Sequence, residues 1–101
     1  MSKRLELHNL LVEALGSRNV YFQPPASITM KYPAIVYTRS RQHTLRANNK
    51  LYKQQTGYMV TVIDPNPDSM IPDRVLELPL CSHSRSYTAN NLNHDVFDIY
   101  Y

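Results

Sequence analysis

Two stretches of alternating residues on either side of Asn48 and Asn49 constrain the fold more than any other part of this chain. Residues 32–43 and 51–63 each alternate between two faces with a period of two, which is typical of β-strands. Both stretches are apolar far from the asparagine pair and polar on both faces next to it. Because asparagine favours turns, we expect the chain to reverse there. The sequence therefore predicts a long β-hairpin whose polar tip protrudes from the domain.

The last ten residues, LNHDVFDIYY, carry apolar side chains on both faces of a further predicted strand. Phe97 and Ile99 fall on one face, and we assign them to the core. Val96 and Tyr100 fall on the other face, which a sheet covered by helices on one side only would leave exposed. We therefore expect Val96 and Tyr100 to contact a neighbouring protein chain.

The remaining segments predict two helices and two further strands. Apolar residues at helical spacing indicate a helix over 2–15 and a shorter one over 69–78. An edge strand at 19–22 is followed by two prolines, and a strand at 81–88 forms a second hairpin with the C-terminal stretch. This order predicts a single α+β domain over residues 1–101, with a mainly antiparallel sheet and two helices packed on one face.

Local signals mark the ends of both predicted helices. Ser2 is a candidate N-cap of the first helix, and Gly16 supplies the left-handed residue that ends it. For the second helix we expect Asp68 or Ser69 as the N-cap. Pro72 fits within the first turn, because its missing N–H needs no partner there.

The net charge of +3 is unevenly distributed along the chain. No acidic residue lies between Glu13 and Asp64, a stretch with a local charge of +7, whereas the flanking residues together carry −4. Such polarity suits nucleic acid or an acidic neighbouring subunit, and a solvated hairpin without a partner is the alternative. The candidate basic strip on the hairpin consists of Arg39, Arg41, Arg46, Lys50 and Lys53.

Three tyrosines of the same hairpin, Tyr37, Tyr52 and Tyr58, are interleaved with these cations. Aromatic side chains among Lys and Arg stack on bases while the cations neutralise phosphates. Tyrosines on strands also belong to cores and interfaces, and the sequence shows no recognisable module that reads base sequence. A small nucleic-acid-binding module is therefore a second hypothesis for the function.

A lone cysteine, Cys81, excludes an internal disulfide and is compatible with a reducing compartment. Cys81 and His83 share a strand face, and His94 on the partner strand would complete a trio of zinc ligands. The spacing matches no two-pair zinc pattern and a fourth ligand is not evident, so a buried cysteine beside strand histidines is the favoured interpretation. No glycine-rich elbow surrounds the thiol, which also disfavours a cysteine nucleophile.

His94 and the acidic residues beside it, Asp95 and Asp98, are a third candidate for a site with chemical activity. On a strand, His94 and Asp98 share a face and Asp95 points the other way, which favours polar decoration of a sheet edge over acid–base catalysis. We therefore expect no catalytic residue, no metal and no cofactor. The apolar runs are too short to span a membrane, and MSKRLELHNLL is too polar for a signal peptide, so we expect a protein of the cytosol or assembled from a cytosolic pool.

Four stretches, RNVYFQPP, KYPAIVY, YKQQTGYMVTVIDPNPDS and RSYTANNLNHDVFDIYY, resemble the tail-terminator or tail-completion proteins of long-tailed bacteriophages. The resemblance extends over nearly the whole chain and rests on sheet and turn phrases. It implies a structural virion protein, assembled in the host cytoplasm, that forms a commonly hexameric ring at the head-proximal end of the tail tube. Such a ring ends tube growth, meets the head-side connector and surrounds the channel through which DNA passes.

Under this resemblance the basic strip faces either the central channel, with sequence-independent attraction to DNA, or an acidic patch on the next subunit. Val96 and Tyr100 would then contact the neighbouring subunit or the tail tube protein. The family brings no catalytic residue, metal or cofactor to this chain. Another neck protein of the stopper or adaptor type shares such a small α+β design and is the alternative within the same class.

Overall fold

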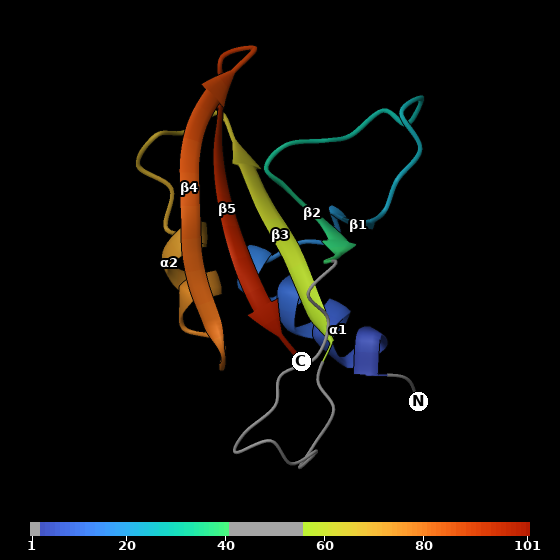
Figure 1. Ribbon diagram of the computed structural model, residues 1–101. Helices are drawn as coiled ribbons and strands as arrows, with labels where there is room; N and C mark the ends of the chain where they lie inside the picture. Colours follow the sequence, from blue (N-terminus) through green and yellow to red (C-terminus); the bar gives the residue numbers. More distant parts are fainter. Residues whose placement is uncertain (1–2, 41–55) are drawn as a thin grey trace.

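The computed structural model of the protein describes residues 3–40 and 56–101. Within these ranges the chain forms two helices and five strands (Figure 1). In chain order they are α1 (Lys3–Leu15), β1 (Val20–Phe22), β2 (Ala34–Arg39), β3 (Gly57–Asp64), α2 (Ile71–Leu76), β4 (Cys81–Ala89) and β5 (Leu92–Tyr100). The predicted α+β class is confirmed.

The five strands form one mixed sheet in the order β1–β2–β3–β5–β4. Neighbours β2 and β3, β3 and β5, and β5 and β4 are antiparallel, whereas β1 runs parallel to β2. A parallel neighbour cannot be reached through a tight turn, and residues 23–33 make the longer connection that this pairing needs. The sheet is therefore mainly antiparallel, with one parallel strand at an edge.

Both helices lie on the same side of the sheet, behind it in the view of Figure 1. Alternate strand residues point to that side, because successive side chains of a strand face opposite ways. The register pairs Tyr37 with Val60 and Val60 with Phe97, so that a row of buried side chains crosses three strands. The core consists of Leu7, Leu11, Ala14, Leu15, Val20, Ile35, Tyr37, Tyr58, Val60, Val62, Ile71, Val75, Phe97 and Ile99.

Two turns have the left-handed backbone that their residues favour: the end of α1 at Gly16, and the turn at Asn90 and Asn91, where the sequence also predicts that the second hairpin reverses. Gly16 has φ of 82° and donates its N–H to the carbonyl of Val12 at 2.8 Å, which confirms the predicted end of α1. Asn90 and Asn91 have φ of 54° and 61° between β4 and β5. A two-residue hairpin turn with positive φ at both positions matches the twist of its strands, and asparagine tolerates that conformation well.

The start of α2 differs from the sequence prediction. Met70 is the N-cap, and its side chain makes no capping hydrogen bond. The hydroxyl of Ser69 accepts the N–H of Ile71 at 3.2 Å, while Asp68 donates its N–H to the side chain of Asn66 at 3.0 Å. The prediction of Asp68 or Ser69 as the N-cap is therefore wrong, because these residues serve side-chain turns ahead of the helix.

Neither α1 nor α2 is long and apolar enough to cross a membrane. The predicted long hairpin corresponds to β2 and β3 in the described part of the chain. Its tip, with the turn at Asn48 and Asn49, and the candidate cap Ser2 lie outside the described residues.

Candidate assembly surfaces

Arg39 is the residue of the predicted basic strip that lies within the described part of the chain. It is the last residue of β2, its side chain is exposed, and it lies opposite Tyr58 of β3. Its backbone N–H donates to the side-chain oxygen of Gln23 at 3.3 Å, which ties the end of β2 to the chain leaving β1. The other strip residues, Arg41, Arg46, Lys50 and Lys53, lie outside the described residues.

Two of the three hairpin tyrosines are core residues. Tyr37 is 0% exposed and Tyr58 only 3% exposed, and their rings meet edge to face with centroids 6.1 Å apart. A ring enclosed in this way offers no face on which a base could stack. The interpretation of Tyr37 and Tyr58 as base-stacking residues is therefore wrong, and Tyr52 lies outside the described residues.

The hydroxyl of Tyr37 joins helix α1 to the sheet. Arg4 donates to it from Nη1 at 3.2 Å, and its oxygen lies 2.7 Å from Nδ1 of His8. The guanidinium of Arg4 also lies over the ring of Phe22, 4.6 Å from its centroid. Burial raises the pKa of Tyr37, whereas burial and the positive charge of Arg4 lower the pKa of His8. The sequence signal that we missed is the spacing of four between Arg4 and His8, which places them along one line of the helix.

The C-terminal strand places its residues on the two faces as predicted, but one of them is not exposed. Phe97 and Ile99 face the helices and are each 1% exposed, which confirms them as core residues. Val96 faces the other way, yet it is only 2% exposed. Because β5 is an interior strand, Thr61 of β3 and Arg85 of β4 flank Val96 in the register. The expected exposure of Val96 is therefore wrong, and its side chain is enclosed within its own subunit.

Tyr100 retains partly exposed surface on the helix-free face of the sheet. It lies opposite Gly57, which has no side chain, and with Asp98 it lines a cavity of about 180 Å³. The adjacent Tyr101 packs against the core and donates its hydroxyl to Glu6 of α1 at 3.1 Å. Of the two predicted contact residues on this strand, Tyr100 is the one that a neighbouring chain can reach.

The helix-free face also carries a stack of aromatic rings near the tip of β4 and β5. Tyr87 and His94 lie parallel, with centroids 4.6 Å apart, and the guanidinium of Arg85 lies 5.7 Å from the centre of the Tyr87 ring. The carbonyl of Leu92 accepts a hydrogen bond from Nδ1 of His94 at 3.1 Å, which fixes the proton on that nitrogen. Tyr87 is 45% exposed, so this stack presents an aromatic surface to solvent.

The candidate zinc ligands are divided between the two faces of the sheet. The register places Cys81 and His83 opposite the core residues of β5, whereas His94 lies on the helix-free face. No group of three or more His, Cys, Asp or Glu side chains that could hold a metal occurs in the described ranges. Burial, reinforced by the charge of Asp98, raises the pKa of Cys81 to about 11, so the thiol is protonated at neutral pH.

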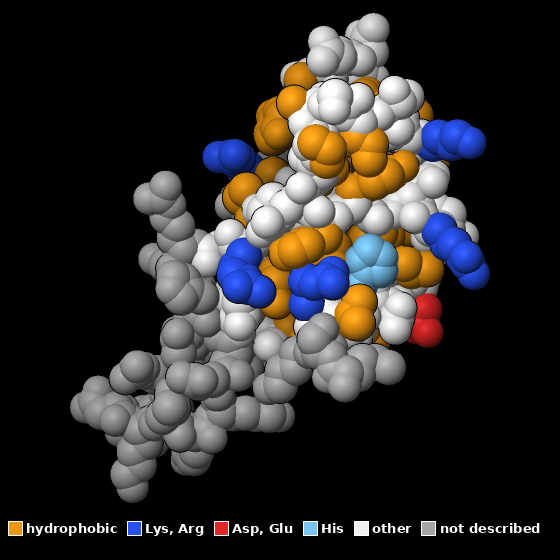
Figure 2. All heavy atoms as spheres, turned by 90° about the vertical axis from the view of Figure 1, so that its right-hand side faces the viewer, with side chains coloured by type: hydrophobic (Ala, Val, Ile, Leu, Met, Phe, Trp, Pro, Cys, Tyr) orange, Lys and Arg blue, Asp and Glu red, His pale blue; other side chains and the backbone are white. Residues whose placement is uncertain are grey.

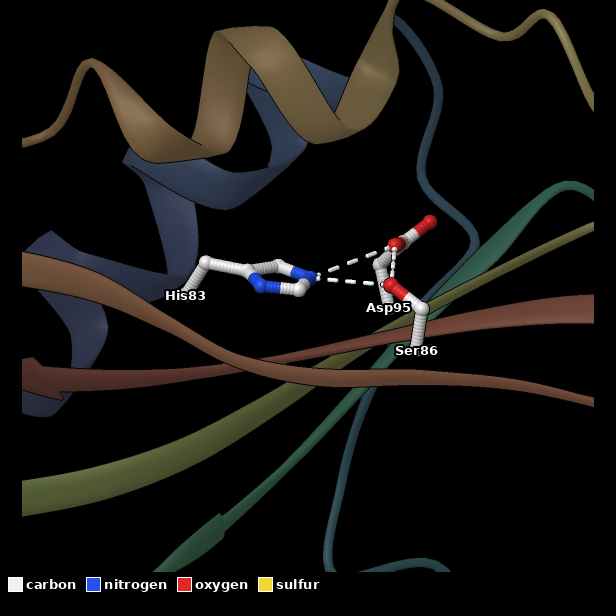
Figure 3. Close-up of polar contacts among 3 residues, drawn as sticks. All are labelled: His83, Ser86 and Asp95. Carbon is white, nitrogen blue, oxygen red and sulfur yellow. Dashed lines mark hydrogen bonds and ion pairs between the residues drawn. The ribbon is translucent and has the colours of Figure 1, made fainter.

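His83, Ser86 and Asp95 form a polar cluster on the helix side of the sheet (Figure 3). Nε2 of His83 lies 3.0 Å from the hydroxyl of Ser86 and 3.4 Å from a carboxylate oxygen of Asp95. The same carboxylate oxygen accepts the hydroxyl proton of Ser86 at 2.5 Å. The ring of His83 also meets Phe97 edge to face, with centroids 5.2 Å apart.

The three residue types of this cluster are those of a hydrolase triad, but the hydrogen bonds run differently. In a triad the histidine accepts the serine proton through one nitrogen and donates to the carboxylate through the other. Here serine and carboxylate share Nε2 of His83, and Ser86 gives its proton to Asp95. A proton on Nε2 satisfies both acceptors, so the imidazole is a donor to Ser86 and not its base. The three side chains therefore form a hydrogen-bonded cluster that links β4 to β5.

Large apolar side chains are exposed on both lateral sides of the sheet. Ile28 and Tyr32 belong to the connection between β1 and β2, beside one edge. Met70, Leu76 and Leu80 surround α2 and the start of β4, beside the opposite edge, and 61% of Met70 and 51% of Leu80 are exposed. Because β1 and β4 are at opposite ends of the strand order, these two apolar surfaces cannot meet within one subunit.

Charge is divided across the sheet in the same way. Arg18, Lys31 and Arg39 flank β1 and β2, in the stretch that has no acidic residue. Figure 2 shows this side, where Lys and Arg side chains lie among hydrophobic ones and acidic side chains appear only near one margin. Residues 64–101, from the last residue of β3 through α2, β4 and β5, carry six acidic and two basic side chains. One side of the subunit is therefore basic and the other acidic.

Comparison of the chain with protein-family models, with curated proteins and with solved structures found no match. We did not predict the exposed residues of the two sides as contact residues; they are Ile28, Tyr32, Met70, Leu76 and Leu80. Their apolar character is visible in the sequence, but their placement at opposite edges follows from long-range strand pairing.

Proposed function

We propose that this chain is a structural virion protein that forms a ring at the head-proximal end of a bacteriophage tail tube. The ring ends tube growth, joins the tail to the head-side connector and surrounds the channel through which DNA passes. The subunit is assembled from the host cytoplasm into the neck of the virion. Its partners are other copies of itself, the tail tube protein and the connector.

The observation that supports this proposal is the pair of unlike surfaces at opposite edges of the sheet. One surface combines Ile28 and Tyr32 with basic residues, and the other combines Met70 and Leu80 with an excess of acidic residues. Two complementary surfaces on one subunit favour a heterologous contact, in which the first side of each copy meets the second side of the next. Repetition of such a contact closes into a ring when the rotation between neighbours permits it.

The basic strip extends the proposal to DNA. DNA that slides through a channel requires attraction to its phosphates without recognition of its bases. Arg39, together with the strip residues outside the described part of the chain, supplies the positive charge for such attraction. The burial of Tyr37 and Tyr58 in the core supports phosphate attraction over base stacking.

Light scattering and negative-stain electron microscopy of the purified chain test the ring. We expect assembly that increases with concentration and particles with a central hole. Growing tail tubes should stop elongating when the ring binds one end. A ring that binds the head connector but never the tube would instead favour a stopper or adaptor protein of the neck.

DNA binding separates this proposal from the nucleic-acid-binding hypothesis. We expect only weak binding of short duplexes, independent of their sequence and strongly reduced by salt. A chain that stays monomeric at every concentration, leaves tube growth unchanged and binds one DNA sequence tightly would contradict the proposal. That result would favour the small nucleic-acid-binding module.

A further inference from the structure

Strand β4 is an open edge of the sheet. It is last in the strand order, runs for nine residues, and its side chains from position 82 to position 88 are exposed. It contains neither proline nor lysine, two residues that commonly block an edge. The other edge strand, β1, has three residues and is followed by Pro24 and Pro25, which have no N–H to donate. The register with β5 shifts between His83 and Arg85, so the outward backbone groups on either side of this irregularity are the ones that β4 offers to another extended chain.

The surroundings of β4 define what such a chain must carry. Helix α2 lies behind β4 in Figure 1, and two exposed carboxylates belong to it: Asp73 in its first turn and Glu77 at its C-cap. Leu80 directly precedes β4 with φ of 54°, and its carbonyl accepts the N–H of Tyr100 at 3.2 Å, so its exposed side chain is held in place by the sheet. An extended segment with apolar side chains and a positive charge would complement this edge.

The chain itself contains a segment of that description. Residues 28–32, with the sequence ITMKY, lie between β1 and β2 and belong to neither strand. Ile28, Lys31 and Tyr32 are exposed, and the N–H of Lys31 donates to the hydroxyl of Tyr21 at 3.4 Å. β-Branched and aromatic residues favour strand formation, and no acidic residue lies nearby in the sequence to oppose the carboxylates of α2.

We propose that segment 28–32 of one subunit adds to the β4 edge of the next subunit as an extra strand. The sheet then continues from subunit to subunit, with Lys31 facing the carboxylates of α2 and the apolar side chains covering Leu80. Because the two surfaces lie at opposite ends of the strand order, the contact forms only between copies. The inference rests on the proposed ring and names the contact that would close it.

Intersubunit disulfide formation tests the pairing directly. In full-length chains carrying Cys81→Ser, Thr29→Cys is mixed in equal amounts with a chain carrying Ser82→Cys, Ser84→Cys or Ser86→Cys. We expect mild oxidation to give a disulfide-linked dimer for at least one mixture, because pairing brings those Cα atoms within about 7 Å. Thr29→Cys mixed with Asn9→Cys, an exposed position on α1, is the matched control and should give no dimer.

Charge exchange tests the same contact without a covalent bond. Lys31→Glu and Glu77→Lys should each raise the subunit concentration needed for assembly by about tenfold, and the double variant should restore assembly. Both positions are exposed in the subunit, so thermal unfolding should be unchanged in all three variants. Restoration by the double variant would not follow from two independent surface effects.

The outcomes separate this inference from the proposed function. A wild-type chain that assembles, while every mixture with Thr29→Cys remains uncrosslinked and both charge variants assemble normally, overturns the edge contact and leaves the ring intact. A wild-type chain that neither assembles nor crosslinks at high concentration overturns both. Crosslinking in a mixture with the α1 control would show collision without a defined contact, and would likewise overturn the inference.

Discussion

The hydroxyl oxygen of Tyr37 lies 2.7 Å from Nδ1 of His8, although the tyrosine is fully buried and the histidine is on a partly exposed part of α1. Arg4 donates to the same oxygen at 3.2 Å, which leaves the phenol proton for His8. A ring nitrogen accepts a hydrogen bond only when it carries no proton. A phenol that donates to Nδ1 therefore favours the neutral imidazole, in agreement with the lowered pKa of His8.

We expect the free energy of unfolding to fall as the pH drops below the ordinary histidine pKa of 6.5. Burial and the charge of Arg4 lower the pKa of His8 in the fold, so the unfolded chain binds more protons just below pH 6.5. The contribution is complete above that pH and is lost as the pH falls towards the lowered pKa of the folded state. Urea unfolding at pH values above and below 6.5 measures the change.

Variants separate His8 from the other histidines in this experiment. His8→Gln should reduce the loss of stability in acid, because glutamine does not titrate. His94→Gln is the matched control and should keep the loss. An unchanged pH dependence in His8→Gln would show that the network does not couple folding to this proton.

Substitutions along β5 should distinguish core residues from the accessible residue. Phe97→Ala should cost about 3–5 kcal/mol and Val96→Ala about 1–2 kcal/mol, since both side chains are buried. Tyr100→Asp should leave a folded subunit that fails to assemble. Thermal unfolding paired with a sizing experiment measures both properties. If Tyr100→Asp unfolds the subunit while Phe97→Ala is tolerated, the roles of the two faces are reversed.

The cluster of His83, Ser86 and Asp95 should contribute little to stability. Its residues are partly exposed, so Ser86→Ala and Asp95→Asn should each change the free energy of unfolding by less than about 1 kcal/mol. Since Ser86 donates to Asp95, its oxygen should also fail to react with a fluorophosphonate probe. Mass spectrometry detects the adduct, and labelling of Ser86 would contradict the hydrogen bond from Ser86 to Asp95.

Cys81 should react slowly with alkylating reagents. A rise of its pKa from 9.0 to about 11 leaves about a hundredfold less thiolate at neutral pH than in the unfolded chain. Alkylation by iodoacetamide, followed by mass spectrometry in buffer and in urea, measures the difference. Asp98→Asn should accelerate the reaction in the folded state, because it removes a charge that disfavours the thiolate. Equal rates in buffer and urea would rule out the protective environment.

Features that depend on neighbouring residues could be predicted from the sequence. The end of α1 at Gly16 and the turn at Asn90 and Asn91 follow from the conformations that these residues tolerate. The assignment of Phe97 and Ile99 to the core follows from alternation along a strand. Each of these predictions needed only a few adjacent residues, and each is confirmed.

Features that depend on which strands become neighbours could not be predicted. The exposure expected for Val96 was wrong because β5 lies between β3 and β4, and no pattern within the strand reveals that position. The parallel pairing of β1 was missed for the same reason. The two lateral surfaces and the Arg4–His8–Tyr37 network join residues that are far apart in the chain, so the candidate site became visible only with the fold.

The parallel pairing of β1 also bears on the order in which the domain folds. A two-residue turn joins β4 to β5, whereas pairing of β1 with β2 requires the connection of residues 23–33 to lose conformational entropy. Because β1 has only three residues, its pairing contributes little stabilisation to offset this entropy. We therefore expect β1 to form late in folding and to open more readily than the other strands. The amide protons of Val20–Phe22 would then exchange with solvent through openings that leave β3 and β5 closed. Segment 28–32, which extends from this strand, is thus attached to the least protected edge of the domain, where a neighbouring subunit would meet little resistance to reshaping it.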